Sequence, residues 1–74
     1  MALEEVESEV TGNVWKIEVS VGDRIEAEDV IMILESMKME IPVESPCAGT
    51  VKELLVREKD SVNENQVLAI VAVT

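Results

Sequence analysis

Hydrophobic and polar residues alternate with a period of two along several short segments of the chain. Over residues 14–19, Trp15, Ile17 and Val19 occupy every second position, and charged residues stand between them. Such alternation is typical of a β-strand that buries one face. We therefore predict a strand here, with Trp15, Ile17 and Val19 turned toward the protein interior.

Other segments show the same alternation, or are short apolar runs rich in branched side chains, which favour buried strands. Pro42 cannot donate a hydrogen bond to a neighbouring strand, so it belongs on a sheet edge or at a bend. The additional strands predicted in this way cover residues 6–10, 30–34, 39–43, 51–56 and 67–73.

The chain also repeats itself. A shift of 37 residues places residues 11–34 on residues 48–71 without a gap. Each half supplies several short strands and leaves an apolar face uncovered, whereas two halves that face each other cover both. We therefore predict an all-β fold, a flattened β-barrel or sandwich of two small antiparallel sheets with pseudo-two-fold symmetry.

The predicted turns follow the repeat. Gly12 and Gly49 occupy equivalent places, which indicates a positive φ or a close backbone approach at both. Gly22 begins a tight turn with the aspartate that follows it. Its equivalent is Lys59, so the second turn either uses another geometry or holds Lys59 in a left-handed conformation. Residues 24–29 have a helix-forming composition but are too few for a stable helix, and we expect a short strand or loop there.

Length and charge narrow the classes of function. The chain has 74 residues and a net charge of −10, from 16 acidic and 6 basic residues. This length fits one domain, and an acidic surface repels phosphate backbones and anionic lipids, so we expect no nucleic-acid partner and no membrane partner. No apolar run approaches the roughly 18 residues of a membrane span, and the acidic N-terminus lacks the order of a signal peptide. The one cysteine, Cys47, cannot form an internal disulfide, which favours a reducing compartment such as the cytoplasm.

The sequence contains no arrangement of residues suited to catalysis. It has no histidine, and it shows no nucleophile paired with a base, no glycine-rich phosphate loop and no metal-ligand cluster. The acidic residues are scattered over segments that we predict to be exposed. We therefore predict that the chain is not an enzyme and holds no metal.

Lys38 stands between the two halves of the repeat, in the tripeptide Met37-Lys38-Met39. A tight hairpin over residues 35–40 projects such a side chain while its own backbone stays rigid. Soft, polarizable methionine side chains on both sides suit an adaptable contact surface. We expect Met37 to be exposed at the bend, and Met39, which alternates with Ile41, to pack partly into the core.

This segment resembles the attachment site of the biotinyl/lipoyl carrier domain family. In biotin carriers the usual run is Ala-Met-Lys-Met, and Ser36 replaces the alanine with a small, nearly isosteric side chain. The residues that carry the resemblance are Glu35-Ser36-Met37-Lys38-Met39, then Ile41, Ser45-Pro46 and Gly49-Thr50-Val51.

The resemblance covers nearly the whole chain. It implies a single biotinyl/lipoyl-like carrier domain over residues 1–74, with half-repeats at about 11–34 and 48–71 and the lysine hairpin at 35–40. The ungapped repeat leaves no room for the insertion found in larger bacterial carboxylase subunits of the family, and we expect no flexible linker before the domain. The chain is therefore most similar to short, free-standing biotin/lipoyl attachment proteins, or to a carrier domain cut from a longer polypeptide.

The same resemblance implies a function. Biotin is the expected cofactor, attached covalently to Lys38 by a biotin protein ligase that reads the flanking Ser36, Met37 and Met39. The chain would then be the carboxyl carrier, or swinging arm, that serves a biotin carboxylase and a carboxyltransferase. The location implied is the cytoplasm, or the mitochondrial matrix if the domain comes from a longer eukaryotic chain.

Two alternatives stay open at this point. A lipoyl carrier of a 2-oxo acid dehydrogenase or glycine cleavage system would have the same fold, with lipoate on Lys38. Lipoyl sites usually read Asp-Lys-Ala, so Met37 and Met39 argue against it. An unmodified interaction module, like the lipoyl-like hairpin of membrane-fusion adaptors, needs no Met-Lys-Met.

Overall fold

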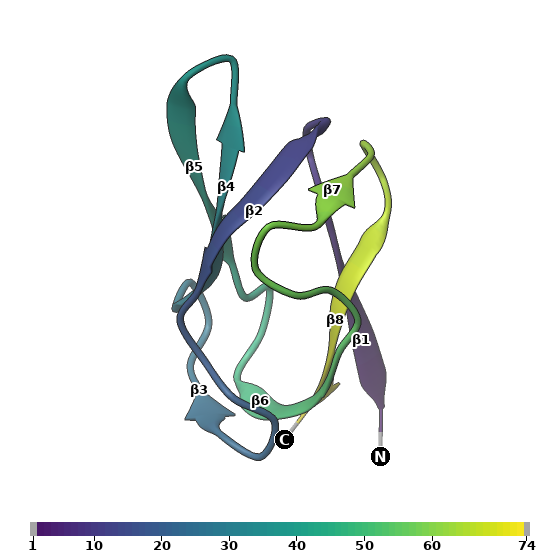
Figure 1. The fold of residues 1–74 in the computed structure, drawn as a ribbon. Coiled ribbons are helices and arrows are strands. Elements are labelled where there is room, and N and C mark those ends of the chain that lie inside the picture. The colour runs from purple at the N-terminus through teal and green to yellow at the C-terminus, as the bar shows by residue number, and fades with distance from the viewer. Residues whose placement is uncertain (1, 74) are drawn as a thin grey trace.

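Two antiparallel sheets of four strands each form the protein, which the computed structural model describes for residues 2–73 (Figure 1). Sheet A has the strand order β1-β8-β6-β3, and sheet B has the order β5-β4-β2-β7. The described residues form no helix that is long and apolar enough to cross a membrane. The predicted fold class is therefore confirmed. The strands are β1 (Leu3–Glu7), β2 (Gly12–Ile17), β3 (Arg24–Ile25), β4 (Val30–Ser36), β5 (Met39–Glu44), β6 (Gly49–Leu54), β7 (Ser61–Val62) and β8 (Val67–Val73).

The core lies between the inner faces of the two sheets and consists of aliphatic side chains and one methionine. Burial of these side chains is the main stabilising term for a chain that has one aromatic residue to contribute. The molecule is elongated, with extents of 36 × 18 × 18 Å. Its largest fully buried apolar side chains are Ile31, Met32, Leu34, Leu68, Val14, Val51, Val62 and Val71.

The predicted pseudo-two-fold symmetry is visible in the backbone hydrogen bonds. Gly22 N donates to the Val51 carbonyl at 2.8 Å, and 37 residues along, Lys59 N donates to the Val14 carbonyl at 2.7 Å. Each half thus pairs its turn with a strand of the other half, so β3 joins β6 in sheet A and β7 joins β2 in sheet B. Because of this exchange, neither half can complete a sheet by itself.

The turn at Lys59 confirms one of the two geometries expected for it. Lys59 has a φ of 79°, and its equivalent Gly22 has a φ of 98°. The same side-chain device closes both turns, since Asp23 accepts a hydrogen bond from Ser20 N and Asp60 accepts one from Arg57 N, each at 2.9 Å. The turn at Lys59 makes the same hydrogen bonds as the turn at Gly22 makes in the other half. These bonds hold Lys59 in a left-handed conformation although it is not a glycine.

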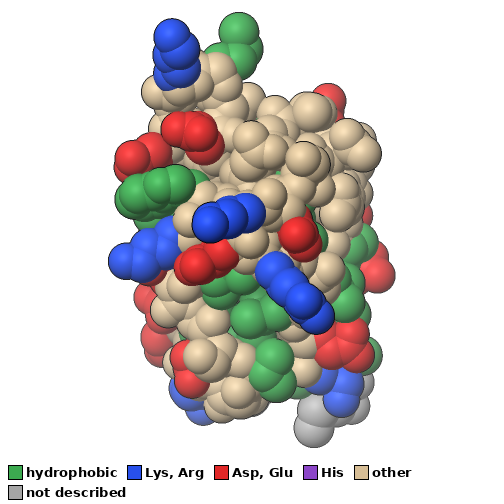
Figure 2. Space-filling model, viewed as in Figure 1, with side chains coloured by type: hydrophobic (Ala, Val, Ile, Leu, Met, Phe, Trp, Pro, Cys, Tyr) green, Lys and Arg blue, Asp and Glu red, His purple; other side chains and the backbone are tan. Residues whose placement is uncertain are grey.

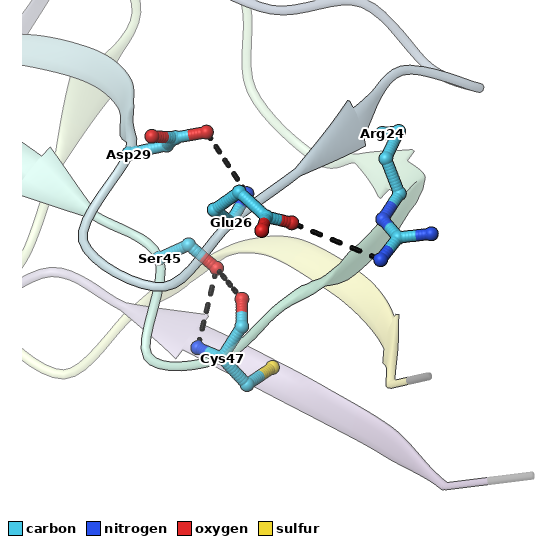
Figure 3. Close-up of polar contacts among 5 residues, drawn as sticks. All are labelled: Arg24, Glu26, Asp29, Ser45 and Cys47. Carbon is cyan, nitrogen blue, oxygen red and sulfur yellow. Dashed lines mark hydrogen bonds and ion pairs between the residues drawn. The ribbon is translucent and has the colours of Figure 1, made fainter.

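Polar side chains also close the turns around β3 and after β5 (Figure 3). Asp29 accepts a hydrogen bond from Glu26 N at 2.9 Å, and Glu26 forms an ion pair of 3.7 Å with Arg24. The buried Ser45 hydroxyl donates to the Cys47 carbonyl at 2.6 Å. Buried polar groups need such partners, and the 45–47 turn therefore leaves no unpaired hydroxyl in the interior.

The predicted inward orientation of Trp15 is wrong. The pairing of β2 with β4 shifts register between Val14 and Lys16, so Trp15 is the extra residue of a β-bulge. As a result Val14 turns inward with 1% exposure, while Trp15 is 51% exposed. Beyond the bulge the prediction is confirmed, because Ile17 and Val19 pack against the core.

The first strand is also displaced from its predicted place at residues 6–10. It runs from Leu3 to Glu7, where it pairs with β8. The Ser8 hydroxyl then donates to the Val10 carbonyl at 2.6 Å, and this local bond turns the chain out of the strand. At the far end of β8, Val73 N donates to the Ala2 carbonyl at 2.9 Å.

Candidate functional site: the lysine hairpin

A two-residue turn joins β4 to β5 and carries Lys38 at one end of the long molecule (Figure 1). Ser36 and Met39 are the last paired residues of the two strands. Between them Met37 has a φ of 52° and Lys38 a φ of 66°. Positive φ at both central residues is the signature of the type I′ turn, whose twist matches that of the flanking strands.

Neither residue of this turn is one that prefers the left-handed conformation. For a residue other than glycine, asparagine or aspartate, that conformation costs about 1–2 kcal/mol. The turn persists because the β4–β5 ladder below it is continuous from Met32 to Ser36. Strain of this kind gathers at functional sites, where the surrounding structure determines the backbone.

The base of the hairpin is anchored to the start of β2. The Ser36 hydroxyl donates a hydrogen bond to the Thr11 carbonyl at 2.8 Å. Gly12 lies directly against the backbone of Glu35, and a Cβ at Gly12 would overlap the Glu35 carbonyl oxygen. The close backbone approach predicted as one option at Gly12 is therefore confirmed, and it serves to seat the hairpin.

The side chains of the turn project away from the body of the protein. Lys38 is exposed, and Met37 is 91% exposed. Within residues 2–73 no carboxylate forms an ion pair with the Lys38 amine. The structure also leaves Met39 largely outside the core, at 63% exposure, so its predicted partial packing is not seen.

The hairpin therefore brings together all four residues singled out from the sequence. Lys38, Met37 and Met39 form an accessible tip, while Ser36 faces the protein and holds the base. Thr11 was not singled out beforehand. The break in the repeat lies at Ser36, whose equivalent Val73 has no hydroxyl, whereas Thr11 accepts the bond through its backbone carbonyl, which any residue supplies.

Chemically, the tip offers one primary amine on a long flexible stem and little else. A lysine amine that is exposed and free of a carboxylate partner is open to acylation by another protein's active site. The two methionines beside it offer soft, adaptable apolar contacts for such a protein.

Comparison with known families agrees with this geometry. The family model described as "Biotin-requiring enzyme" matches residues 4–71. The biotin/lipoyl attachment protein of Bacillus subtilis (strain 168) is 49% identical over 63 residues, which cover 85% of this chain and 86% of that protein. The biotinylated protein TB7.3 homolog of Mycobacterium leprae is 39% identical over 69 residues, covering 93% of this chain and 97% of that protein.

Solved structures show the same fold within much longer chains. The Kluyveromyces lactis urea carboxylase matches with a TM-score of 0.92 and 35% identity, covering 97% of this chain and 6% of that chain. A single-chain, multi-domain long-chain acyl-CoA carboxylase matches with a TM-score of 0.91 and 22% identity, a likeness that concerns the fold alone.

Proposed function

The chain belongs to the biotin/lipoyl family, and from this premise we propose that it is a biotin carboxyl carrier with biotin bound covalently to Nζ of Lys38. The predicted family, the non-catalytic carrier role and biotin as the cofactor are confirmed by the family match and by two relatives, a biotin/lipoyl attachment protein and a biotinylated protein homolog. The position of attachment and its recognition are our proposal.

One observation carries the assignment of Lys38. Its amine stands at the tip of a two-residue turn, exposed and flanked by two exposed methionines. The residues present fit the cofactor, because an amide bond to the biotin carboxyl group requires a reachable amine and no binding pocket. The uncharged Nζ amine would attack the activated carboxyl carbon that a ligase presents; the activating group would leave, the nitrogen would lose one proton, and a neutral amide would remain.

Each residue of the hairpin then has a distinct part. Lys38 provides the attachment atom, and its stem would contribute rotatable bonds to the arm. Bound biotin supplies the ureido nitrogen on which a carboxyl group is carried. Met37 and Met39 provide the contact surface for a biotin protein ligase, while Ser36 keeps the tip at a fixed height through its bond to Thr11.

The wider setting of the activity is also part of the proposal. We infer that residues 1–74 act as one carrier domain, with half-repeats at 11–34 and 48–71, that visits a biotin carboxylase and a carboxyltransferase. The urea carboxylase match at 35% identity and the pyruvate carboxylase of Staphylococcus aureus at 31% support partners of this class. We place the protein in the cytoplasm, where its lone thiol stays reduced.

Intact mass spectrometry after co-expression with a biotin protein ligase tests the assignment. The wild-type chain should gain the mass of one biotinyl group, and Lys38→Arg should gain none, because a guanidinium cannot form the amide. Lys59→Arg is the matched control and should be labelled like the wild type. A lipoyl adduct, or a biotin adduct that persists on Lys38→Arg, would contradict the proposal.

A further inference from the structure

A groove of about 420 Å³ lies between the end of β1 and strand β5. These are outer strands, β1 of sheet A and β5 of sheet B, so the groove marks a place where the two sheets part. Its floor is apolar and its rim is acidic. The floor is formed by Val10, Leu34 and Ile41, and the rim carries Glu7, Glu9 and Glu44.

The charges around this groove are of one sign. Residues 1–15 and 39–51 contain no lysine or arginine. Among the described residues, the ion pairs are Lys16–Glu18 and Arg24–Glu26, so none of the three rim carboxylates is paired. Figure 2, viewed from the side of β2 and β7, shows lysine and arginine side chains interspersed with acidic side chains on the face that it displays.

The rim is not built for a metal ion. Within residues 2–73, no group of three or more acidic, histidine or cysteine side chains is close enough to hold one. Carboxylates that are spaced apart along a groove suit several separate cations instead. The apolar floor between them favours apolar side chains in the partner as well, because covering an apolar strip removes it from water and lowers the free energy.

We propose that this groove, which we call the acidic groove, docks an extended segment of a partner protein in which basic and apolar side chains alternate. Basic residues of the segment meet Glu7, Glu9 and Glu44, and the apolar residues between them cover Ile41 and its neighbours. Recognition is through side chains, because Pro42 has no N–H with which β5 could pair with an added strand.

The position of the acidic groove gives the docking a purpose. Ile41 lies three residues after Lys38, which is about 10 Å along an extended strand. Alternation along β5 places Met39 on the same side of the strand as Ile41, so the groove floor points toward the tip of the hairpin. A partner segment held there brings its own protein beside the lysine. This docking is independent of whether Lys38 carries biotin.

Nuclear magnetic resonance titration of the unmodified, 15N-labelled full chain tests the proposal. The probe is a capped octapeptide of alternating lysine and leucine. Shifts of backbone amides should be confined to residues 7–10, Leu34, Ile41 and residues 43–45, since Pro42 and Pro46 have no amide proton. The triple variant Glu7→Gln, Glu9→Gln, Glu44→Gln should bind about tenfold more weakly, because three exposed charge pairs are lost.

A charge-matched variant provides the control. Glu28→Gln, Glu53→Gln and Glu64→Gln change the net charge by the same amount at exposed residues that do not line the groove. This variant should lose less than about threefold in affinity, as expected for long-range charge alone. Equal losses in the two triple variants, shifts spread over the whole surface, or equal binding of a lysine–serine octapeptide would each overturn the proposal.

Discussion

Replacement of Met37 by glycine should make the protein more stable. Met37 holds a φ of 52° in the turn, and glycine adopts that conformation without the clash of a Cβ atom. Relief of the left-handed conformation is worth about 1–2 kcal/mol. The added freedom of glycine in the unfolded chain takes back about 0.4–1 kcal/mol.

The loss of the methionine side chain itself costs little, because Met37 is 91% exposed and buries almost no apolar area. The net expectation is a gain of about 0.5–1 kcal/mol in the free energy of unfolding. For a domain of 74 residues, that gain corresponds to a rise of about 4 °C in the melting temperature.

Urea denaturation followed by far-ultraviolet circular dichroism measures the change. Met39→Gly is the matched control, because Met39 belongs to β5 and pairs with Ser36. Glycine inside a strand is destabilising by about 0.5–1 kcal/mol, so the two variants should shift the midpoint in opposite directions. If both variants lowered the midpoint by the same amount, the left-handed turn and the reasoning built on it would be refuted. Under the proposed function, Met37→Gly should also slow biotinylation, since it removes a ligase contact.

The remaining predictions concern the core and the two kinds of glycine. Leu68→Ala, at 0% exposure, should reduce the free energy of unfolding by about 3 kcal/mol, whereas Leu55→Ala, at 48% exposure, should reduce it by less than about 1 kcal/mol; equal midpoints in urea would show the core is misassigned. Gly12→Ala should cost about 2 kcal/mol, because the new methyl group overlaps a β4 carbonyl. In Gly22→Ala the new methyl group meets open space, so this change should cost only the left-handed penalty of about 1 kcal/mol. Calorimetry should therefore give Gly12→Ala a lower melting temperature than Gly22→Ala. Lys59→Gly should raise the free energy of unfolding by about 0.5 kcal/mol and the melting temperature by a few degrees. A lower melting temperature would argue against the left-handed φ of Lys59.

Apolar runs rich in branched side chains located β4 and β8, although the pairing of each strand with its neighbours contains register shifts. Alternation over residues 14–19 failed only at Trp15, because a bulge adds one residue there, so Val14 lies on the inner face before the bulge and Ile17 lies on it after the bulge. The repeat already indicated that Trp15 is exposed, because its equivalent is Lys52 and lysine is almost never fully buried. The pairing of β3 and β7 with strands of the opposite half could not be predicted from the sequence, because a strand of two residues has no periodic pattern.

The sequence predicted the residues of the site better than it predicted the backbone and hydrogen bonds that hold them in place. The place of Lys38 between two copies of a repeat indicated a hairpin tip, and the flanking methionines indicated an attachment site. The left-handed backbone of Met37 and Lys38 was not predicted, because neither residue type favours it. The bond from Ser36 to Thr11 joins residues far apart in the chain, so only the folded structure reveals it.

The contact between Ala2 and Val73 has a mechanical consequence. It places the two ends of the described chain side by side, at the pole opposite the hairpin (Figure 1). A linker joined to either end would therefore leave the barrel on the side away from Lys38. The barrel would then act as a rigid spacer, up to 36 Å long, between the linker and the hairpin. It would keep the linker away from Lys38 while the tip moves between distant sites.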